Sequence, residues 1–198
     1  CISPNRFYIQ ESKKDEFVNK FIEKTKKLKI GNGMEQDVQL GPITTLKRLG
    51  EIEELVEITK KEGAKVLIGG KRPSGFNKGY FYEPTVFDDV DDNFTIMKTE
   101  PFGPLVPMLS FKSFDEVVER ANNNDLGLCS YIYTNSMEKA HKASELMETG
   151  CVAVNTPTVA IAEAPFGGIK QTGYGREGGS MAIKDYLNIK YTHLGLKT

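Results

Sequence analysis

The sequence has little of what metal centres, disulfide scaffolds and nucleic-acid-binding proteins need. Only two histidines occur, His141 in a stretch rich in Lys and Glu and His193 near the end, so a two-histidine metal site has no basis and we expect no metal. The three cysteines form no Cys-x-x-Cys pair, and any disulfide scheme leaves one over, which favours a reduced, cytoplasmic protein. The formal net charge of −1 argues against a nucleic-acid partner.

Several other sequence patterns are absent. No apolar run approaches the roughly eighteen residues that span a bilayer, and no charged and apolar leader is present, so we expect no membrane partner. The chain has no GxxxxGK[ST] phosphate loop, no GxGxxG after a strand and no GxSxG serine elbow. The acidic run at 88–92 lacks the glycine and closing glutamate of a calcium loop, and is interpreted as a solvated turn.

Strand and helix patterns alternate along the 198 residues, 39% of which are hydrophobic and 27% charged. Strands are expected at residues 7–10, 64–68, 80–87, 105–111, 128–133 and 151–154. Helices are expected from Ser12, over 45–61, from Ser113, from Asn135 and briefly near 178–186. This alternation predicts an α/β fold with a mostly parallel sheet covered by helices on both faces.

Local signals refine these expectations. Ser12 with Asp15, Ser113 with Glu116 and Asn135 with Glu138 resemble N-terminal capping pairs. Pro84 cannot donate to a strand ladder, and its position predicts that the strand at 80–87 lies at a sheet edge.

The chain opens on Cys1, which allows three interpretations. It is the nucleophile of a larger enzyme, an N-terminal nucleophile that uses its own α-amine as base, or a residue without function at a boundary. The last interpretation has about even weight on position alone.

Two loops carry further chemistry. Pro101 and Pro104 stiffen the segment 99–104, in which Glu100 and the ring of Phe102 stand two residues apart. Such a segment suits a site that holds a flat ligand and hydrogen-bonds to its hydroxyls. Residues 164–177 combine Phe166 with four glycines, which indicates a close backbone approach. The alternatives are a solvated glutamate on a proline-stiffened connection and a simple packing corner.

Together these segments resemble the aldehyde dehydrogenase superfamily over nearly the whole chain. The matching motifs, in order, are Cys-x-x-x-Asn-Arg-x-Tyr-x-Gln, Tyr-Phe-x-Glu-Pro-Thr-Val, Glu-x-Phe-Gly-Pro, Ala-Asn-x-x-x-x-Gly-Leu, Gly-x-Val-x-Val-Asn and Pro-Phe-Gly-Gly-x-Lys-x-x-Gly-x-Gly-Arg-Glu. The resemblance implies a thiol-bearing catalytic domain over 1–184 and an oligomerisation strand and tail over 185–198. It also implies a dinucleotide-binding portion upstream, which this sequence does not include.

The resemblance also assigns roles to residues. It implies that Cys1 is the catalytic thiol, and that Glu100 and Phe102 contact the nicotinamide end of NAD or NADP. It places the aldehyde pocket around Asn155, Ala160 and Phe166, and implies a homo-oligomer that acts on a small-molecule aldehyde. In relatives the general base and a side-chain oxyanion donor precede the cysteine, so this chain alone is expected to be inactive.

The C-terminal motifs are most similar to the succinate-semialdehyde and glyceraldehyde dehydrogenase branch. A serine that commonly holds the substrate carboxylate is replaced within 159–162 by Val-Ala-Ile-Ala, which makes glyceraldehyde a serious competitor. A non-catalytic assembly domain and an N-terminal-cysteine hydrolase remain as alternatives; the hydrolase would require antiparallel sheets.

Overall fold

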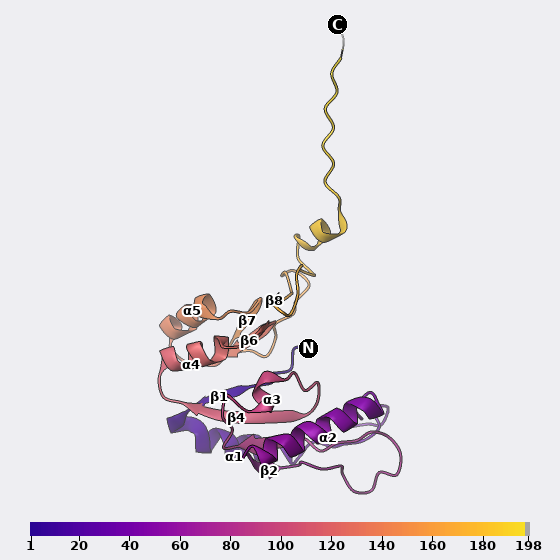
Figure 1. Ribbon diagram of the computed structural model, residues 1–198, viewed down its shortest axis with the longest axis vertical. Helices are drawn as coiled ribbons and strands as arrows, with labels where there is room; N and C mark the ends of the chain where they lie inside the picture. The colour runs from indigo at the N-terminus through magenta and orange to yellow at the C-terminus, as the bar shows by residue number, and fades with distance from the viewer. Residues whose placement is uncertain (197–198) are drawn as a thin grey trace. The chain divides into compact units, whose positions relative to one another are not determined.

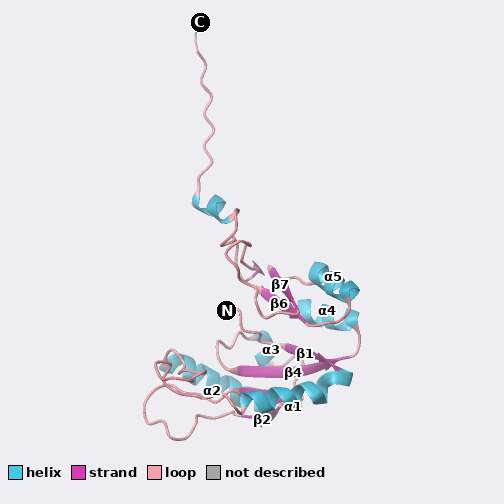
Figure 2. Cartoon of the chain, turned by 180° about the vertical axis from the view of Figure 1, so that it is seen from behind, coloured by secondary structure: helices cyan, strands magenta, loops and turns pink. Residues whose placement is uncertain are grey.

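The computed structural model of the chain describes residues 1–196. Two compact units are present. The first holds Cys1 and Ser3–Asn123, and the second holds Ile2 and the chain from Asn124 onward. Figures 1 and 2 show the order and kind of the elements.

The first unit is built on a four-stranded sheet in the order β1-β4-β3-β2. Its strands are β1 (Phe7–Gln10), β2 (Lys65–Ile68), β3 (Thr85–Asp88) and β4 (Leu105–Phe111). The pairs β1–β4 and β3–β4 are parallel, while β2–β3 is antiparallel. The prediction of an α/β fold with a mostly parallel sheet is confirmed.

Helices cover both faces of this sheet. The helical segments are η1 (Glu11–Lys13), α1 (Lys14–Thr25), α2 (Leu46–Lys61), α3 (Thr95–Lys98) and α4 (Phe114–Asn122). Phe87, Leu105 and Leu109 share one core with residues of α2 and α3, whereas Val86 and Met108 share a second core with α1. Neighbouring strand residues point to opposite faces, so β3 and β4 supply residues to both cores. Their sequences are therefore nearly continuous apolar runs.

The expected edge position of the strand after Pro84 is wrong. Strand β3 begins at Thr85, so Pro84 stands outside the ladder and removes no hydrogen bond from it. The strand lies between β2 and β4, in the interior of the sheet.

Two of the three expected capping pairs are also wrong. The pair Ser113 and Glu116 forms a reciprocal capping box at α4, as predicted. By contrast, the turn of 3₁₀ helix at 11–13 delays the start of α1, whose N-cap residue Lys13 makes no side-chain cap. In the second unit the cap of α5 is Ser136, which accepts from the Lys139 amide, one residue after the expected Asn135.

A partly buried polar network connects α4 to β1. Arg120 Nε lies 2.6 Å from Asp92 Oδ2, and Tyr8 donates its hydroxyl to Asp92 Oδ1 at 2.7 Å. The Arg120 guanidinium also stacks over the Tyr8 ring, 5.1 Å from its centroid. Asp92 is therefore a half-buried structural carboxylate, and its assignment to a solvated turn is corrected.

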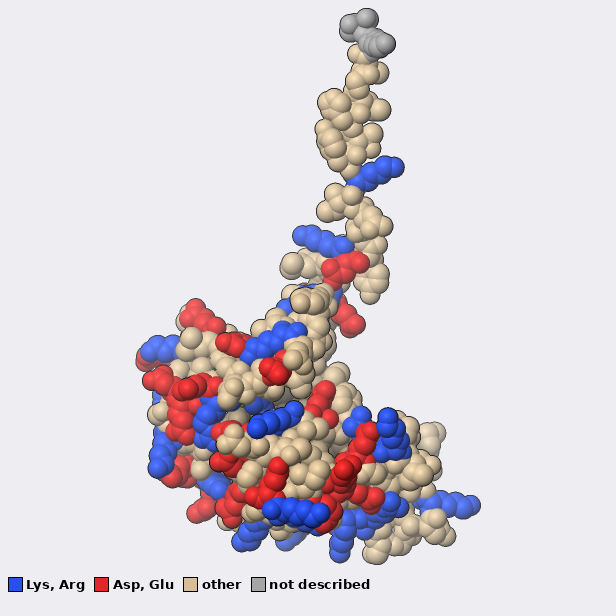
Figure 3. Space-filling view, viewed as in Figure 1, with Lys and Arg blue, Asp and Glu red and all other residues tan. Residues whose placement is uncertain are grey.

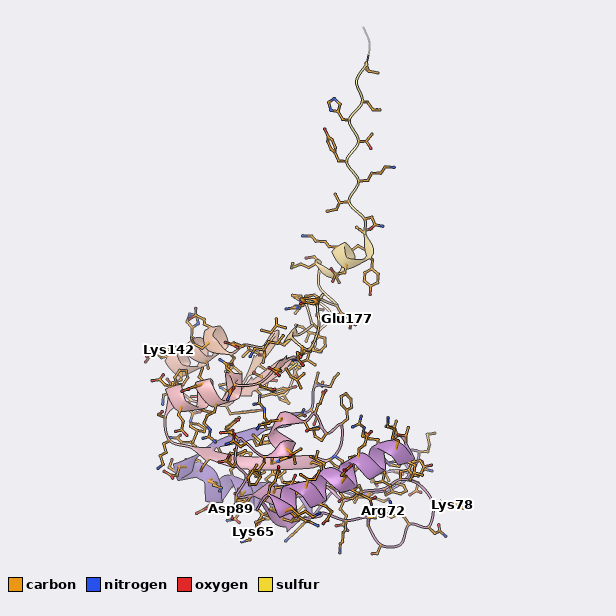
Figure 4. The ribbon with its side chains drawn as sticks, in the orientation of Figure 1. Lys65, Arg72, Lys78, Asp89, Lys142 and Glu177 are labelled. Carbon is orange, nitrogen blue, oxygen red and sulfur yellow. The ribbon has the colours of Figure 1, made fainter. Side chains whose placement is uncertain are left out.

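A bidentate ion pair fixes the start of the exposed 71–79 loop. Arg72 contacts Glu53 on α2 through Nε at 2.6 Å and through Nη2 at 2.8 Å. Figure 4 labels Arg72 and, further along the same loop, Lys78.

The second unit holds two small two-stranded sheets. Strands β6 (Cys129–Ile132) and β7 (Cys151–Val154) pair in parallel, connected by α5 (Met137–Leu146). Strands β5 (Leu126–Gly127) and β8 (Ile169–Lys170) pair antiparallel, and η2 (Ala182–Tyr186) follows.

The expected oligomerisation strand and tail, 185–198, begins within η2. From Leu187 to Leu196 the structure assigns no strand, and the apolar side chains are exposed: Leu187, Ile189, Tyr191, Leu194 and Leu196. Residues 197–198 lie outside the described residues, and pairing of this tail with another strand stays a prediction. None of the helices within residues 1–196 has the length and apolar character needed to cross a membrane.

Burial of Tyr82 predicts a pH dependence of stability. Desolvation in the core, followed by nearby carboxylates with Glu53 first, raises the pKa of Tyr82 to about 12. A raised folded-state pKa contributes stability that is complete below the unfolded value near 10 and is lost as the pH rises toward 12. The free energy of unfolding of the wild type should therefore fall more steeply across this interval than that of Tyr82→Phe, measured by urea denaturation. Tyr80→Phe, at an exposed tyrosine of the same segment, should behave like the wild type; equal slopes in all three proteins would contradict the prediction.

Candidate active site

Two predicted site segments lead into strands at the same end of one sheet. Strands β1 and β4 are parallel neighbours, with Phe7 paired to Met108 and Ile9 to Ser110. Cys1 precedes β1, and the loop with Glu100 and Phe102 immediately precedes β4. Because parallel neighbours run in one direction, the segments before them meet at the same sheet edge. The topology therefore brings together the thiol segment and the Glu100 loop, which are a hundred residues apart in sequence.

The Glu100 loop is fixed at its base and open at its tip. Pro101 is buried, and Gly103 packs so closely on α2 that an added Cβ would lie 2.5 Å from Ile52 Cδ1. Downstream, the Pro104 carbonyl accepts from the Thr85 amide at 2.8 Å, which joins the loop to β3. The loop conformation is thus held by the sheet and by α2.

The two predicted cofactor residues stand on this loop and face outward. Glu100 is exposed, and its carboxylate has no ion-pair or hydrogen-bond partner within residues 1–196. Phe102 has a left-handed backbone, with φ of 43°, and its side chain is 57% exposed. The Phe102 ring is therefore presented to solvent from a backbone conformation that large side chains rarely adopt.

Only one of the three cysteines is exposed, and it is Cys1. The other two are partly buried and face each other at the start of β6 and β7. Cys1 is therefore the most accessible thiol of this chain.

In the second unit, Asn155 directly follows strand β7 and fixes the direction of the loop that begins there. Its Oδ1 accepts from the Thr134 amide and its Nδ2 donates to the Thr134 carbonyl, both at 2.9 Å. Asn155 has φ of 55°, a left-handed conformation that asparagine tolerates better than most residues. Both polar atoms of the side chain are hydrogen-bonded to Thr134, just after β6. Asn155 can therefore contribute to an aldehyde pocket only by setting the direction of the loop that follows it.

Ala160 and Phe166 lie on the long loop after Asn155. Ala160 is exposed, and Phe166 is half-buried. The Phe166 backbone exchanges two hydrogen bonds of 2.7 Å with Glu177, which Figure 4 labels. The glycine-rich sequence is explained by close backbone packing, because a Cβ on Gly167 would lie 2.6 Å from the Gly175 carbonyl oxygen.

Residues 1–192 of the chain match the model of the aldehyde dehydrogenase family. The chain belongs to the aldehyde dehydrogenase family. Its curated relatives include glutarate-semialdehyde dehydrogenase of Pseudomonas putida, 41% identical over 96% of this chain and 39% of the relative. The succinate-semialdehyde dehydrogenase GabD of Escherichia coli is 38% identical over 99% of this chain and 40% of the relative. The chain therefore spans about two fifths of the length of the relatives it matches.

Solved aldehyde dehydrogenase structures share the fold. A succinate-semialdehyde dehydrogenase from Burkholderia pseudomallei superposes with a TM-score of 0.90 at 36% identity, covering 94% of this chain and 38% of that one. An NAD⁺ complex of aldehyde dehydrogenase from Bacillus cereus gives 0.93 at 38% identity, covering 98% and 39%. These likenesses confirm the predicted family and the fold of its catalytic domain.

One contact of this aldehyde dehydrogenase chain was missed in the sequence. The Tyr131 hydroxyl donates to the Ile2 carbonyl at 2.5 Å, next to Cys1 in the chain. Nothing in the local sequence pattern links Ile2 to Tyr131, which are 129 positions apart. Tyr131 lies two residues after Cys129 in β6, so the two side chains are on the same face of the strand. Within residues 1–196 no group of three or more metal-ligating side chains occurs.

The charged side chains do not indicate a partner of one sign. Lys and Arg are interspersed with Asp and Glu on the face seen in Figure 3. The pattern agrees with the net charge of −1.

The Asn155 geometry predicts the effect of two substitutions. Asn155→Ala removes both hydrogen bonds to Thr134 and retains a Cβ in the left-handed region, so it should destabilise the chain by about 2–4 kcal/mol. Asn155→Gly loses the same hydrogen bonds without the left-handed penalty, and should be about 1 kcal/mol more stable than the alanine variant. Denaturant unfolding of both variants checks this, and an alanine variant as stable as the glycine variant would contradict the role of the backbone.

Proposed function

We propose that this chain is the thiol-bearing portion of an NAD(P)-dependent aldehyde dehydrogenase that converts a small aldehyde to its carboxylic acid. The observation that carries the proposal is the single exposed thiol, Cys1, in a chain that matches the family over residues 1–192. The mostly parallel sheet also argues against an N-terminal-cysteine hydrolase, which packs antiparallel sheets.

Cys1 forms and breaks the covalent bond to the substrate. After losing its proton to a base, the Cys1 sulfur attacks the aldehyde carbon, and the carbonyl oxygen becomes an oxyanion that hydrogen-bond donors stabilise. Loss of hydride from that carbon leaves a thioester on Cys1. Water then adds to the thioester, and its collapse releases the carboxylic acid and restores the thiol.

Glu100 and Phe102 fit the nicotinamide end of the cofactor. When bound, NAD or NADP supplies the acceptor for the hydride. Glu100 offers a carboxylate with no partner within residues 1–196, which can accept hydrogen bonds from ribose hydroxyls. The exposed Phe102 ring offers an apolar surface beside it. The fixed base of the loop holds both groups in place before the ligand arrives.

The substrate belongs to the semialdehyde or glyceraldehyde class. Similarity to succinate- and glutarate-semialdehyde dehydrogenases supports an aldehyde with a distal carboxylate. The sequence Val-Ala-Ile-Ala at 159–162 lacks a hydroxyl for that carboxylate, which favours a less acidic aldehyde such as glyceraldehyde. Asn155, Ala160 and Phe166 border the pocket in this proposal. We also expect a cytoplasmic homo-oligomer in which the apolar tail after Tyr186 adds to a sheet.

The role of Cys1 is tested by substitution in the complete enzyme. Cys1→Ala should abolish aldehyde oxidation, because this chain has no other exposed thiol to replace the nucleophile, while NAD(P) affinity stays nearly unchanged. Steady-state turnover and cofactor titration measure the two properties. Cys129→Ser, at a partly buried cysteine, is the matched control and should retain turnover. Retained turnover in Cys1→Ala would refute the assignment.

The role of Glu100 is tested by the rate of hydride transfer. Glu100→Gln weakens a charge-assisted hydrogen bond worth about 1.5–3 kcal/mol, so the hydride step should slow about 10- to 100-fold. Single-turnover measurement of reduced cofactor reports that step. The control Glu119→Gln changes an exposed glutamate on α4 and should leave the rate unchanged. If Glu100→Gln kept the wild-type cofactor affinity and hydride-transfer rate, the assignment would be contradicted and Glu100 would be a solvated surface residue.

A further inference from the structure

Two cysteines that the proposed reaction does not use stand directly opposite each other. Cys129 opens β6 and Cys151 opens β7, and the parallel register pairs these two residues. Paired residues of neighbouring strands project from the same face of the sheet, and such strands lie about 4.8 Å apart. That spacing falls inside the roughly 4.4–6.8 Å between Cα atoms that a disulfide spans. The pairing therefore places the two Cα atoms at a spacing that a disulfide can span.

The surroundings of the pair favour two-sulfur chemistry. The Cys151 thiol is 3.7 Å from the Gly167 carbonyl oxygen, and it is also within hydrogen-bonding reach of the Cys129 thiol. Both residues are only partly buried, so a small reagent can reach them. No third metal-ligating side chain joins them among the described residues, which leaves the pair short of a metal site.

The two thiols are not equivalent. Burial, followed by the neighbouring Cys151, raises the pKa of Cys129 to about 11, so Cys129 is protonated at neutral pH. The thiolate is the reactive form of a cysteine. The raised pKa makes Cys129 the less reactive thiol, so we assign it the second step.

We propose that Cys129 and Cys151 form a redox-active dithiol that closes to an intrachain disulfide on reaction with a small-molecule disulfide such as oxidised glutathione. The Cys151 thiolate attacks one sulfur of the reagent, breaks its S–S bond, forms a mixed disulfide and releases one reduced thiol. Cys129, as it loses its proton, attacks the Cys151 sulfur and displaces the second reduced thiol. Two protein thiols are oxidised and one small disulfide is reduced to two thiols.

The test follows the mass of the folded 198-residue chain in the Cys1→Ser background, which removes the exposed third thiol. After incubation with oxidised glutathione, the intact mass should fall by two hydrogen atoms, with no glutathione retained. A non-reducing peptide map should join the peptides that contain Cys129 and Cys151. The rate of closure should rise with pH, because each step needs a thiolate.

Single substitutions separate closure from ordinary thiol oxidation. With Cys129→Ser the reaction should stop at a stable glutathione adduct on Cys151. With Cys151→Ser the remaining Cys129, whose pKa is raised chiefly by desolvation, should react at least tenfold more slowly. The peptide map of the wild-type sequence needs no variant and covers the case in which a serine variant does not fold. Two free thiols, or a persistent glutathione adduct on the two-cysteine chain, would overturn the proposal.

Discussion

The parallel pairing of β1 with β4 is the interaction on which the first unit depends. It aligns the strand that follows Cys1 with the strand that follows the Glu100 loop, and it places both approaches at one sheet edge. The same two strands supply residues to the two cores, with Leu105 and Leu109 on one face and Ile9 and Met108 on the other. Because each strand residue is committed to one face, the register cannot slip by one position without exposing both cores. The register of β1 on β4 therefore determines both the packing of the two cores and the placement of the two site segments.

Features coded by neighbouring residues could be predicted from the sequence. The apolar run of β4, the capping box of Ser113 with Glu116 and the strand Cys151–Val154 all lie where the pattern placed them. Each depends on contacts within a few residues, which a sequence displays directly. The small misplacements at Ser12 and Asn135 have the same origin, since several polar residues compete for one cap and the backbone selects only one.

Features made by distant residues could not be predicted in this way. The pairing of Asp92 with Arg120 spans 28 residues and crosses two elements, so its aspartate resembled any other member of an acidic turn. Likewise, the cysteines at 129 and 151 looked unrelated until the register of β6 and β7 placed them opposite each other. The Glu100 loop could be identified by its motif, whereas its fixed base required the packing of Gly103 on Ile52.

The separation of β1 and β4 in sequence has a consequence for folding. Their register pairs residues 7 and 108, so 101 residues separate the partners. At synthesis rates of about 5–20 residues per second, β1 leaves the ribosome roughly 5–20 seconds before its partner. During that interval its backbone donors and acceptors are unpaired, and the two cores that receive its side chains lack the residues supplied by β4. Long-range pairing of this kind slows folding, and it gives molecular chaperones a defined window in which to act on the nascent chain.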